Sequence, residues 1–313
     1  MDNQRNSSGI PSRALGRTGV EVTAIGLGGY HLGLVNDDNE AVRLVHEAVD
    51  AGITFLDNAW EYHNGRSEEL MGKAIEDRRD KVFLMTKVCT HGRDRHVAMR
   101  QLEDSLRRLR TDYLDLWQVH EVVYDNEPEL HFAKGGVIEA LEQARREGKV
   151  RFIGFTGHKS PEIHLKMLSY DYPFDTCQLP LNCFDATFRS FERQVLPELE
   201  RRGIAAIGMK SLGGEGTMVK AGAVTAEEAL RYVMSLPIAT VVSGMESLEA
   251  LRQNLGVARG FAPMSDDEMR RLRERCAALA GDGRFEHFKT TAKFEGPVGR
   301  EQHGFPPPGE LTA

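Results

Sequence analysis

An alternation of strand-like and helix-like segments is the feature that most constrains how this chain folds. Short apolar and β-branched runs start about 26 to 37 residues apart, and these predicted strands cover 24–29, 54–57, 82–87, 113–119, 150–155, 176–181, 204–209 and 239–244. Amphipathic helices are predicted between and after them, at about 39–51, 67–77, 95–109, 136–147, 161–169, 190–202, 225–235 and 247–257. Strands that alternate with helices pair in parallel through right-handed crossovers. Eight such units in about 230 residues predict an α/β fold of the (β/α)8 TIM-barrel type.

The glycines of the first predicted strand argue against the alternative of an open, doubly wound sheet. Such a sheet carries a GxGxxG pattern directly after its first strand, where a helix begins on the bound phosphate. The sequence Gly26-Leu27-Gly28-Gly29 lacks this spacing, and no helix begins before about Asn39. These glycines therefore favour close packing in a barrel and a loop after it, rather than a phosphate-binding loop.

Additional segments precede and follow the barrel core, which is predicted at about 24–258. The first eleven residues are polar and are expected to lack regular structure. Residues 13–22 are expected to form an N-terminal hairpin around a glycine-containing turn. We expect one domain over 12–313, in which 259–313 contribute a C-terminal helix and tail.

The C-terminal region is predicted to begin with a helix and to end as an extended tail. Ser265 and Glu268 have the spacing of a capping box, so a helix is expected from there to about Leu279. The tail from Gly281 onward contains six glycines and four prolines, and this composition predicts a long extended loop. The sequence leaves open whether this loop merely wraps the surface or covers the substrate side of the barrel.

The composition excludes several classes of function. The net charge of −7 argues against a surface that binds nucleic acid or an anionic membrane. No apolar run approaches the roughly 18 residues of a transmembrane helix, and the N-terminal residues lack the apolar core of a signal peptide. The four cysteines form no CxxC pair and no zinc-type spacing with histidine. We expect a cytoplasmic protein with reduced thiols, a small-molecule substrate and no metal.

Polar residues stand where three consecutive predicted strands end. Asp57 ends the strand that begins at Thr54, Lys87 ends the next one, and His120 follows the third. Tyr62 lies in the loop after the first of these strands. In a (β/α)8 barrel the active site is built at the C-terminal ends of the strands. We therefore expect these four side chains to meet at one mouth of the barrel.

The four residue types suit the protonation of a carbonyl oxygen. Opposite charges on Asp57 and Lys87 stabilise each other in a buried site, and a cation beside a phenol is expected to lower the pKa of Tyr62. Tyr62 would then act as a general acid, with His120 holding the carbonyl against it. The cluster offers no nucleophile except the lysine and no metal ligands, so electrons must come from a cofactor. Alone, an Asp–Lys pair or one histidine is more often structural, but all four together favour a functional site.

Several motifs resemble those of the aldo-keto reductases over about residues 12–258. They are Leu-Gly-Arg-Thr-Gly at 15–19, Gly-Ile-Thr-Phe-Leu-Asp-Asn-Ala at 52–59, Tyr62, Gly-Arg-Ser-Glu at 65–68, Lys-Val-Phe at 81–83 with Lys87, Ser-Leu-Arg-Arg-Leu at 105–109, Asp-Tyr-Leu-Asp-Leu at 112–116, and His120. The resemblance implies a (β/α)8 barrel that binds NADP or NAD across its mouth. It implies that Tyr62 is the acid, that Asp57 and Lys87 tune it, and that His120 orients the carbonyl.

The same resemblance implies a set of cofactor-binding residues at the ends of the later strands. These are Thr156, Gln178, Asn182, Met209, Lys210, Ser211, Leu212, Gly244, Glu246, Gln253 and Asn254. The match is uneven, because Gly157 stands where the family usually has asparagine and Met209 where it usually has an aromatic ring. In the eighth unit Glu246 stands where many relatives have a small or basic residue. It either disfavours the 2′-phosphate of NADP or simply faces water at the helix N-terminus, so the sequence leaves the choice between NAD and NADP open. Tyr30, Trp60 and Phe184 are expected to wall the substrate pocket.

The leading interpretation is an NAD(P)H-dependent reductase of aldehydes or ketones, acting in either direction. One alternative is a regulatory or binding protein that keeps the fold and the cofactor but has little turnover. A less favoured alternative is a lyase in which Lys87 forms a Schiff base with its substrate. Neither the oligomeric state nor the substrate follows from the sequence.

Overall fold

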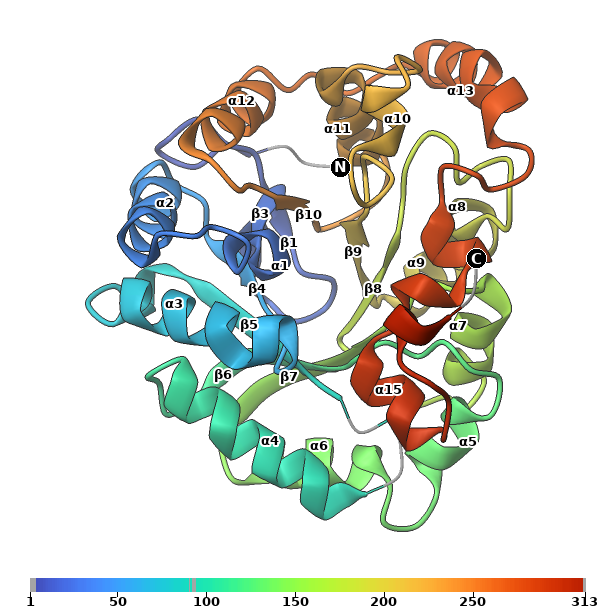
Figure 1. The fold of residues 1–313 in the computed structure, drawn as a ribbon. Helices are drawn as coiled ribbons and strands as arrows, with labels where there is room; N and C mark the ends of the chain where they lie inside the picture. Colours follow the sequence, from blue (N-terminus) through green and yellow to red (C-terminus); the bar gives the residue numbers. More distant parts are fainter. Residues whose placement is uncertain (1–3, 90, 92–93, 312–313) are drawn as a thin grey trace.

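The computed structural model describes residues 4–89, 91 and 94–311, and its centre is a closed barrel of eight parallel strands (Figure 1). The strands are β3 (Ile25–Gly28), β4 (Phe55–Asp57), β5 (Phe83–Val88), β6 (Leu114–Val119), β7 (Val150–Thr156), β8 (Thr176–Pro180), β9 (Ala205–Met209) and β10 (Thr240–Gly244). Neighbours in sequence are neighbours in the barrel, and β10 closes it by pairing with β3 in the register Val241 to Ile25. The predicted (β/α)8 barrel is thereby confirmed.

Helices surround the barrel at the places where the apolar periodicity predicts them (Figure 1). They are α2 (Asp38–Asp50), α3 (Arg66–Ile75), α4 (Arg95–Arg108), α6 (Val137–Arg146), α7 (Pro161–Leu168), α8 (Phe191–Gln194), α9 (Leu196–Arg202), α11 (Ala226–Ser235) and α12 (Leu248–Arg259). The helix expected at 190–202 is divided at Val195, because Pro197 stands in the first turn of α9 and donates no backbone hydrogen bond. Three short helices in the loops were not predicted: α1 (Gly29–Leu32), α5 (Glu127–Phe132) and α10 (Thr217–Lys220).

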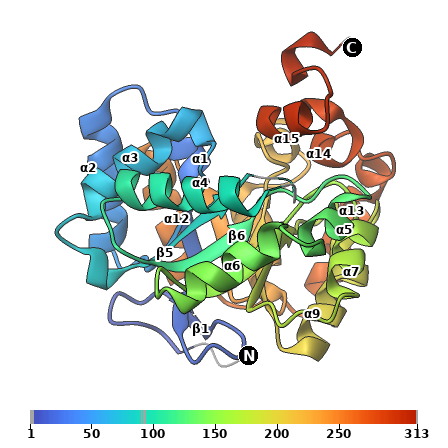
Figure 2. The same ribbon diagram turned by 90° about the horizontal axis from the view of Figure 1, so that it is seen from below.

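The predicted N-terminal hairpin closes one end of the barrel. It consists of β1 (Ser12–Ala14) and β2 (Glu21–Thr23). Leu15 and Val22 are buried in one apolar cluster with Phe55 and Phe83, whose rings stack 5.4 Å apart inside the barrel. Figure 2 shows β1 on the face opposite α15, so the other end of the barrel is where the strands deliver their C-terminal residues.

The segment before the hairpin is more ordered than its polar composition predicts. Arg5 donates hydrogen bonds to the carbonyls of Gly9, Arg259 and Phe261, and Ile10 is completely buried. The expectation of an unstructured start is therefore wrong for residues 4–11. One apolar side chain and several long-range hydrogen bonds suffice to hold these residues against the barrel.

The C-terminal tail folds into helical turns rather than the extended loop predicted. After α13 (Asp266–Ala280), which has the predicted capping box, come α14 (His287–Thr290), η3 (Ala292–Phe294), α15 (Pro297–Gln302) and η4 (Pro308–Glu310). Each turn is too short to show helical periodicity in the sequence. The tail is held by buried Lys289, whose ammonium group lies 2.6 Å from Asp185 and 2.9 Å from Glu286.

This tail lies over one side of the C-terminal end of the barrel (Figure 2). α14 and α15 lie on that end (Figure 2), and hydrogen bonds join the tail to the segments that follow β5, β6, β7 and β8. Within the described part of the chain, no helix is long and apolar enough to cross a bilayer.

Candidate active site

The four residues predicted for catalysis meet at the open end of the barrel. Lys87 on β5 donates to Asp57 Oδ1 at 2.6 Å and to the carbonyl of Asn58 at 2.7 Å. The Lys87 Nζ atom also lies 3.4 Å from the hydroxyl oxygen of Tyr62. The rings of Tyr62 and His120 are edge to face, with centroids 5.7 Å apart. The ends of adjacent parallel strands and the loop after β4 therefore bring an ion pair, a phenol and an imidazole together, with Tyr62 half-buried and the other three side chains buried.

The loop that presents Tyr62 is fixed by backbone geometry and by one buried carboxylate. His63 and Asn64 have φ of 52° and 56°, and Gly65 follows with φ of 90°. A side chain on Gly65 would collide with the guanidinium group of Arg108. Glu68, in the first turn of α3, is completely buried and accepts hydrogen bonds from Thr86, Ser105 and Arg108.

The electrostatic surroundings of Tyr62 differ from the prediction. Burial raises the pKa of Tyr62 well above its usual value, and the carboxylates of Asp57, Glu61 and Glu121 raise it further. The expected lowering by Lys87 is wrong, because three acidic groups and desolvation oppose one ammonium group that already donates elsewhere. At neutral pH the phenol therefore keeps its proton.

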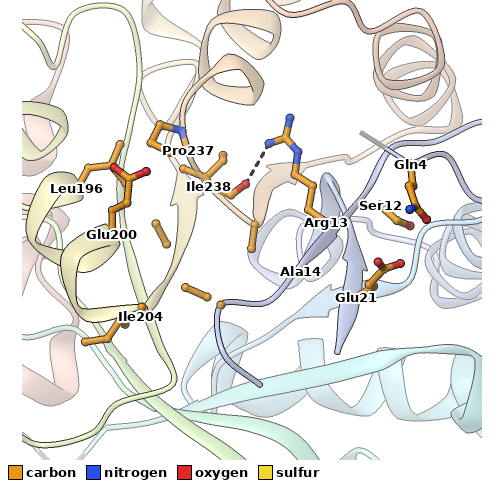
Figure 3. A pocket seen from close by; sticks show the side chains of 15 residues that line it. Gln4, Ser12, Arg13, Ala14, Glu21, Leu196, Glu200, Ile204, Pro237 and Ile238 are labelled. Carbon is orange, nitrogen blue, oxygen red and sulfur yellow. Dashed lines mark hydrogen bonds between the residues drawn. The ribbon is translucent and has the colours of Figure 1, made fainter. Parts of the chain in front are cut away.

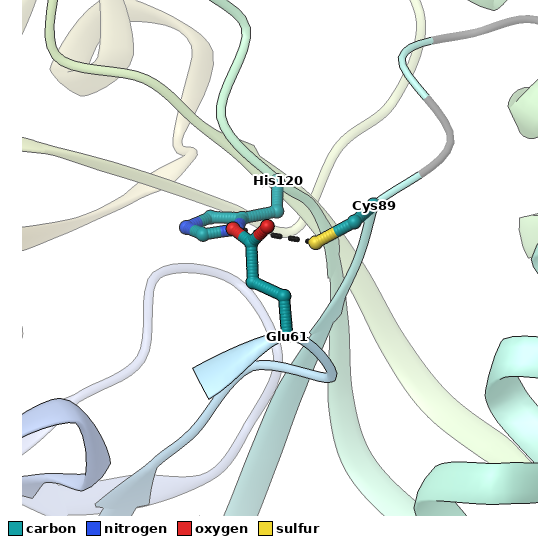
Figure 4. A group of neighbouring side chains, drawn as sticks. All are labelled: Glu61, Cys89 and His120. Atoms are coloured by element: carbon teal, nitrogen blue, oxygen red, sulfur yellow. Dashed lines mark hydrogen bonds and ion pairs between the residues drawn. The ribbon is translucent and has the colours of Figure 1, made fainter. Parts of the chain in front are cut away.

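A carboxylate that the sequence analysis missed lies beside His120. Glu61 Oε1 is 2.8 Å from His120 Nδ1, and Cys89 Sγ is 3.4 Å from the same nitrogen (Figure 4). Burial lowers the pKa of His120, while the hydrogen bond and the charge of Glu61 act in the opposite direction. With Nδ1 occupied, Nε2 is the ring atom left to meet a substrate. The signal in the sequence was an acidic residue directly before Tyr62.

The C-terminal tail covers this cluster. Glu121 directly follows His120 in the chain, and its Oε1 accepts a hydrogen bond from the backbone N–H of Gly296. A Cβ atom on Gly296 would lie 2.7 Å from Glu121 Oε1 and 3.0 Å from Glu61 Oε2, so a larger residue there would displace these carboxylates. Burial and the nearby charge of Glu61 raise the pKa of Glu121 well above its usual value. Of the two alternatives for the tail, the structure therefore favours a cover on the substrate side.

The residues predicted to hold the nicotinamide end of the cofactor lie at the same mouth. Thr156 is buried at the end of β7, and Gln178 on β8 points its Nε2 toward Asp57 Oδ1 at 3.4 Å. The Gln178 Oε1 atom is buried without a partner among the described residues. An unpaired buried acceptor suits the amide N–H of a nicotinamide carboxamide. This part of the site fits the cofactor that the sequence predicts.

The side chain of Asn182 forms hydrogen bonds with other residues of the protein. Its Nδ2 donates to Glu286 Oε1 at 3.0 Å, and its Oδ1 accepts from the backbone of Phe184 and Asp185. In this structure Asn182 joins the loop after β8 to the C-terminal tail.

The end of β9 and the loop after it carry four more of the predicted cofactor residues. Met209 ends β9, Lys210 has a left-handed backbone with φ of 56°, and Ser211 and Leu212 follow it. The ammonium group of Lys210 lies 5.3 Å from the ring centroid of Phe288. Burial lowers the pKa of Lys210, and Glu121 opposes this shift.

The eighth unit presents a helix N-terminus to the predicted adenosine end. Ser247 caps α12, and Asn254 on this helix donates to Ser243 Oγ at 3.0 Å. Gly244 faces the ring of His31, which occupies the space that a side chain there would need. Glu246 and Gln253 are exposed.

The three predicted substrate residues occupy different surroundings. Tyr30 is 50% exposed and lies edge to face with Tyr62 at 5.4 Å, so it borders the mouth. Trp60 lies near the guanidinium group of Arg108 on α4, 5.4 Å from its ring centroid. Phe184 is completely buried and meets Phe285 of the tail at 5.5 Å.

A cavity of about 370 Å³ lies at the opposite end of the barrel, beside the hairpin (Figure 3). Arg13 crosses it and donates to the carbonyl of Ile238 at 3.0 Å. Glu21 and Glu200 also line it, but none of the four predicted catalytic residues does. The chemistry of the molecule is therefore assigned to the mouth under the tail.

Comparison with known proteins decides the family. The model of the aldo/keto reductase family matches residues 24–224, which is well over half of the chain. The chain belongs to the aldo/keto reductase family. An uncharacterized oxidoreductase of Bacillus subtilis, YqkF, is 26% identical over 300 residues, and the match covers 83% of this chain and 94% of that protein.

Solved structures agree with this assignment. An aldo-keto reductase from Bacillus halodurans superposes with a TM-score of 0.72 at 23% identity, covers 85% of this chain and 96% of its own, and supports the fold. An aldo/keto reductase from Klebsiella pneumoniae in complex with NADP and acetate has a TM-score of 0.66 at 26% identity. The match covers 82% of this chain and 93% of that protein. The present aldo/keto reductase is an NAD(P)-dependent oxidoreductase.

Proposed function

We propose that this aldo/keto reductase reduces an aldehyde or ketone to an alcohol, with Tyr62 as the proton donor. The observation that carries the proposal is the cluster at the barrel mouth, where the Tyr62 hydroxyl lies 3.4 Å from Lys87 Nζ and beside the ring of His120. The bound nicotinamide supplies the hydride. The chain itself must then orient the carbonyl, exclude water and deliver one proton to the oxygen.

Tyr62 suits the last of these tasks in the reductive direction. Its raised pKa keeps the hydroxyl protonated at neutral pH. An alkoxide formed by hydride addition is a far stronger base than a phenolate, so it takes the proton. The Lys87 ammonium group stabilises the phenolate that remains. Alcohol oxidation needs that phenolate from the start, so the same surroundings disfavour it.

His120 and Glu61 together orient the carbonyl in this mechanism. Glu61 accepts the Nδ1 proton at 2.8 Å, so His120 can donate from Nε2 only when the ring is protonated on both nitrogens. The charge of Glu61 favours that cation, and burial opposes it. Glu61 is thus a positioning residue that acts through His120.

Reduction is expected to weaken as the pH rises through the pKa of His120, which burial places below its usual value. Above that pKa the Nε2 proton is lost, and the carbonyl loses a hydrogen-bond donor. Glu61→Gln removes the charge that supports the cation, so the fall in kcat/KM should move to lower pH. The measurement is the pH profile of kcat/KM for one aldehyde at saturating NADPH.

Glu69→Gln serves as the control for this experiment, because Glu69 is an exposed carboxylate in the first turn of α3. Its pH profile should match that of the wild type. If the Glu61→Gln profile also matched, the role given to Glu61 would be rejected.

The adenosine end of the site is expected to favour NADH. Glu246 stands exposed beside the N-terminus of α12, where a 2′-phosphate would meet its charge. Arg252, the nearest base on this helix, is paired with Glu47 on α2 at 2.7 Å. Glu246→Arg should therefore strengthen NADPH binding relative to NADH, since a guanidinium group matches phosphate geometry.

Dissociation constants for both reduced cofactors, measured at low and moderate salt, test this preference. Glu249→Arg on the first turn of α12 is the control for a general increase in positive charge. A wild-type preference for NADPH that Glu246→Arg left unchanged would eliminate the assignment of Glu246.

Steady-state oxidation of NADH and NADPH with a panel of aldehydes and ketones tests the proposed function itself. Turnover on a class of carbonyl compounds would support it, and binding of cofactor without turnover would favour a regulatory protein. Trapping with borohydride separates the lyase alternative, because only a Schiff base on Lys87 would be fixed to substrate. The two short hydrogen bonds of Lys87 to Asp57 and Asn58 disfavour that reaction.

A further inference from the structure

A second polar cluster lies near the active site, between the barrel and the C-terminal tail. It combines His91 from the loop after β5, Glu127 at the start of α5, and His303 directly after α15. One ligand atom of each residue lies within 4.8 Å of the others. His91 Nδ1 and His303 Nε2 both contact the same carboxylate oxygen, Glu127 Oε1, the latter at 3.1 Å.

The carboxylate of Glu127 is held in place by its other oxygen. Glu127 Oε2 accepts the backbone N–H groups of Val123 at 2.6 Å and Tyr124 at 2.9 Å. Two such hydrogen bonds favour the ionised form and leave Oε1 directed at the imidazoles. Among the described residues, the ion pairs of Glu127 are formed with these two histidines alone.

The cluster is shielded from water by apolar and aromatic groups. The side chains of His91 and Glu127 are 1% and 0% exposed, and that of His303 is 6% exposed. Tyr124 packs on His303 with ring centroids 4.2 Å apart. The ring of Phe305 stacks on that of His303, with centroids 5.9 Å apart. A buried carboxylate surrounded by imidazoles needs a compensating charge.

Imidazole nitrogens without a partner among the described residues lie in and beside this cluster. The Nε2 atom of His91 is buried without a partner among the described residues. His131, one turn beyond Glu127 on α5, is completely buried, and neither of its ring nitrogens has a described partner.

We propose that His91, Glu127 and His303 bind a divalent transition-metal ion of the Zn²⁺ class, and that this ion fastens the C-terminal tail over the active site. Two imidazoles and one carboxylate are a ligand set that Zn²⁺ prefers. The ligand atoms are His91 Nδ1, Glu127 Oε1 and His303 Nε2, and the fourth position is left for water.

The neighbouring group of Glu61, Cys89 and His120 also has ligand-type side chains within 4.8 Å of one another (Figure 4). It is the weaker candidate for a metal. Burial and the charges of Glu61 and Glu121 raise the pKa of the Cys89 thiol well above its usual value, and the thiolate is the form that binds zinc. His120 is also assigned to the carbonyl substrate.

The position of His303 gives the metal a consequence for the tail. The adjacent Gln302 donates to the carbonyl of Cys89 at 3.0 Å, and Gly296 at the start of α15 donates to Glu121. The loops after β5 and β6 are thus joined to one short helix at three points. The proposed ion connects these segments and stabilises the covered form of the site.

Zinc titration of the full chain, after removal of metals with EDTA and dialysis, tests the proposal. The probe is ZnCl₂ in competition with a chromophoric chelator. We expect one ion per chain, and a loss of affinity of at least about 100-fold in His303→Ala and in Glu127→Gln, since even indirect partners of a metal contribute 10- to 100-fold. Zinc should also slow proteolysis of the tail in the wild type but not in His303→Ala.

Two variants serve as controls. His287→Ala removes an exposed histidine from the same tail and should bind zinc like the wild type. Cys89→Ser should also retain the ion. The proposal is overturned if the wild type binds no zinc in this competition, if His303→Ala binds it as well as the wild type, or if Cys89→Ser alone abolishes binding.

Discussion

Replacement of Tyr62 by phenylalanine is expected to lower kcat for carbonyl reduction by about 10²–10⁴-fold, the usual contribution of a general acid. The ring would keep its edge-to-face contacts with Tyr30 and His120, while the proton donor 3.4 Å from Lys87 Nζ would be lost. Dissociation constants of the reduced cofactor should change little. Stopped-flow and steady-state measurements on one good aldehyde, combined with cofactor titrations, separate the two effects.

Tyr113→Phe is the matched control for this experiment. Tyr113 directly precedes β6, so it stands at the end of the strand opposite His120. Its replacement should leave turnover near that of the wild type. Wild-type turnover in Tyr62→Phe would remove the proposed acid and, with it, the mechanism.

The second large effect is expected for Lys87→Met, which should lose both activity and stability. Lys87 and Asp57 are 1% and 4% exposed in their side chains and lie 2.6 Å apart. Removal of one partner from a buried ion pair leaves the other charge uncompensated, at a cost of about 3–5 kcal/mol. Turnover should fall as well, because the phenolate left by proton transfer loses the nearby cation. Urea denaturation and steady-state kinetics measure the two losses.

The double variant Asp57→Asn, Lys87→Met distinguishes the two roles of the pair. With both charges removed, the penalty of an unpaired buried carboxylate disappears, so much of the lost free energy of unfolding should return. Activity should stay low. Recovery of activity in the double variant, or a single variant as stable and active as the wild type, would contradict the role of Lys87.

Much of the fold could be predicted because each barrel unit repeats a local pattern. Apolar runs of strand length and helices with one apolar face recur eight times, and the capping box at Ser265 marks the start of α13. The turns of the tail could not be predicted in this way. They are a few residues long and depend on distant partners such as Asp185, which meets Lys289 across 104 positions of sequence.

The catalytic cluster was predictable for a related reason: strand ends in a parallel barrel share one face, so Asp57, Lys87 and His120 could be placed together from their positions alone. The direction of the pKa shift of Tyr62 could not be predicted, since it depends on how deeply the phenol is buried and on the approach of Glu61 and Glu121. The cofactor and substrate residues remain predictions.

The cluster of His91, Glu127 and His303 had no signature in the sequence. Zinc motifs are recognised by short spacings, whereas these residues are separated by 36 and 176 positions. Only the return of the tail to the mouth of the barrel brings the last histidine to the other two. A search for ligand spacing therefore finds nothing, although three ligand side chains are present.

The hairpin that closes one end of the barrel has a practical consequence for handling the protein. It places the start of the chain on the closed face, while the last helical turns lie on the face that substrate must approach (Figure 2). A tag, surface linker or fusion partner joined at the N-terminal side would therefore leave the mouth clear. The same addition at the C-terminal side would be attached to the tail that lies over the mouth of the barrel.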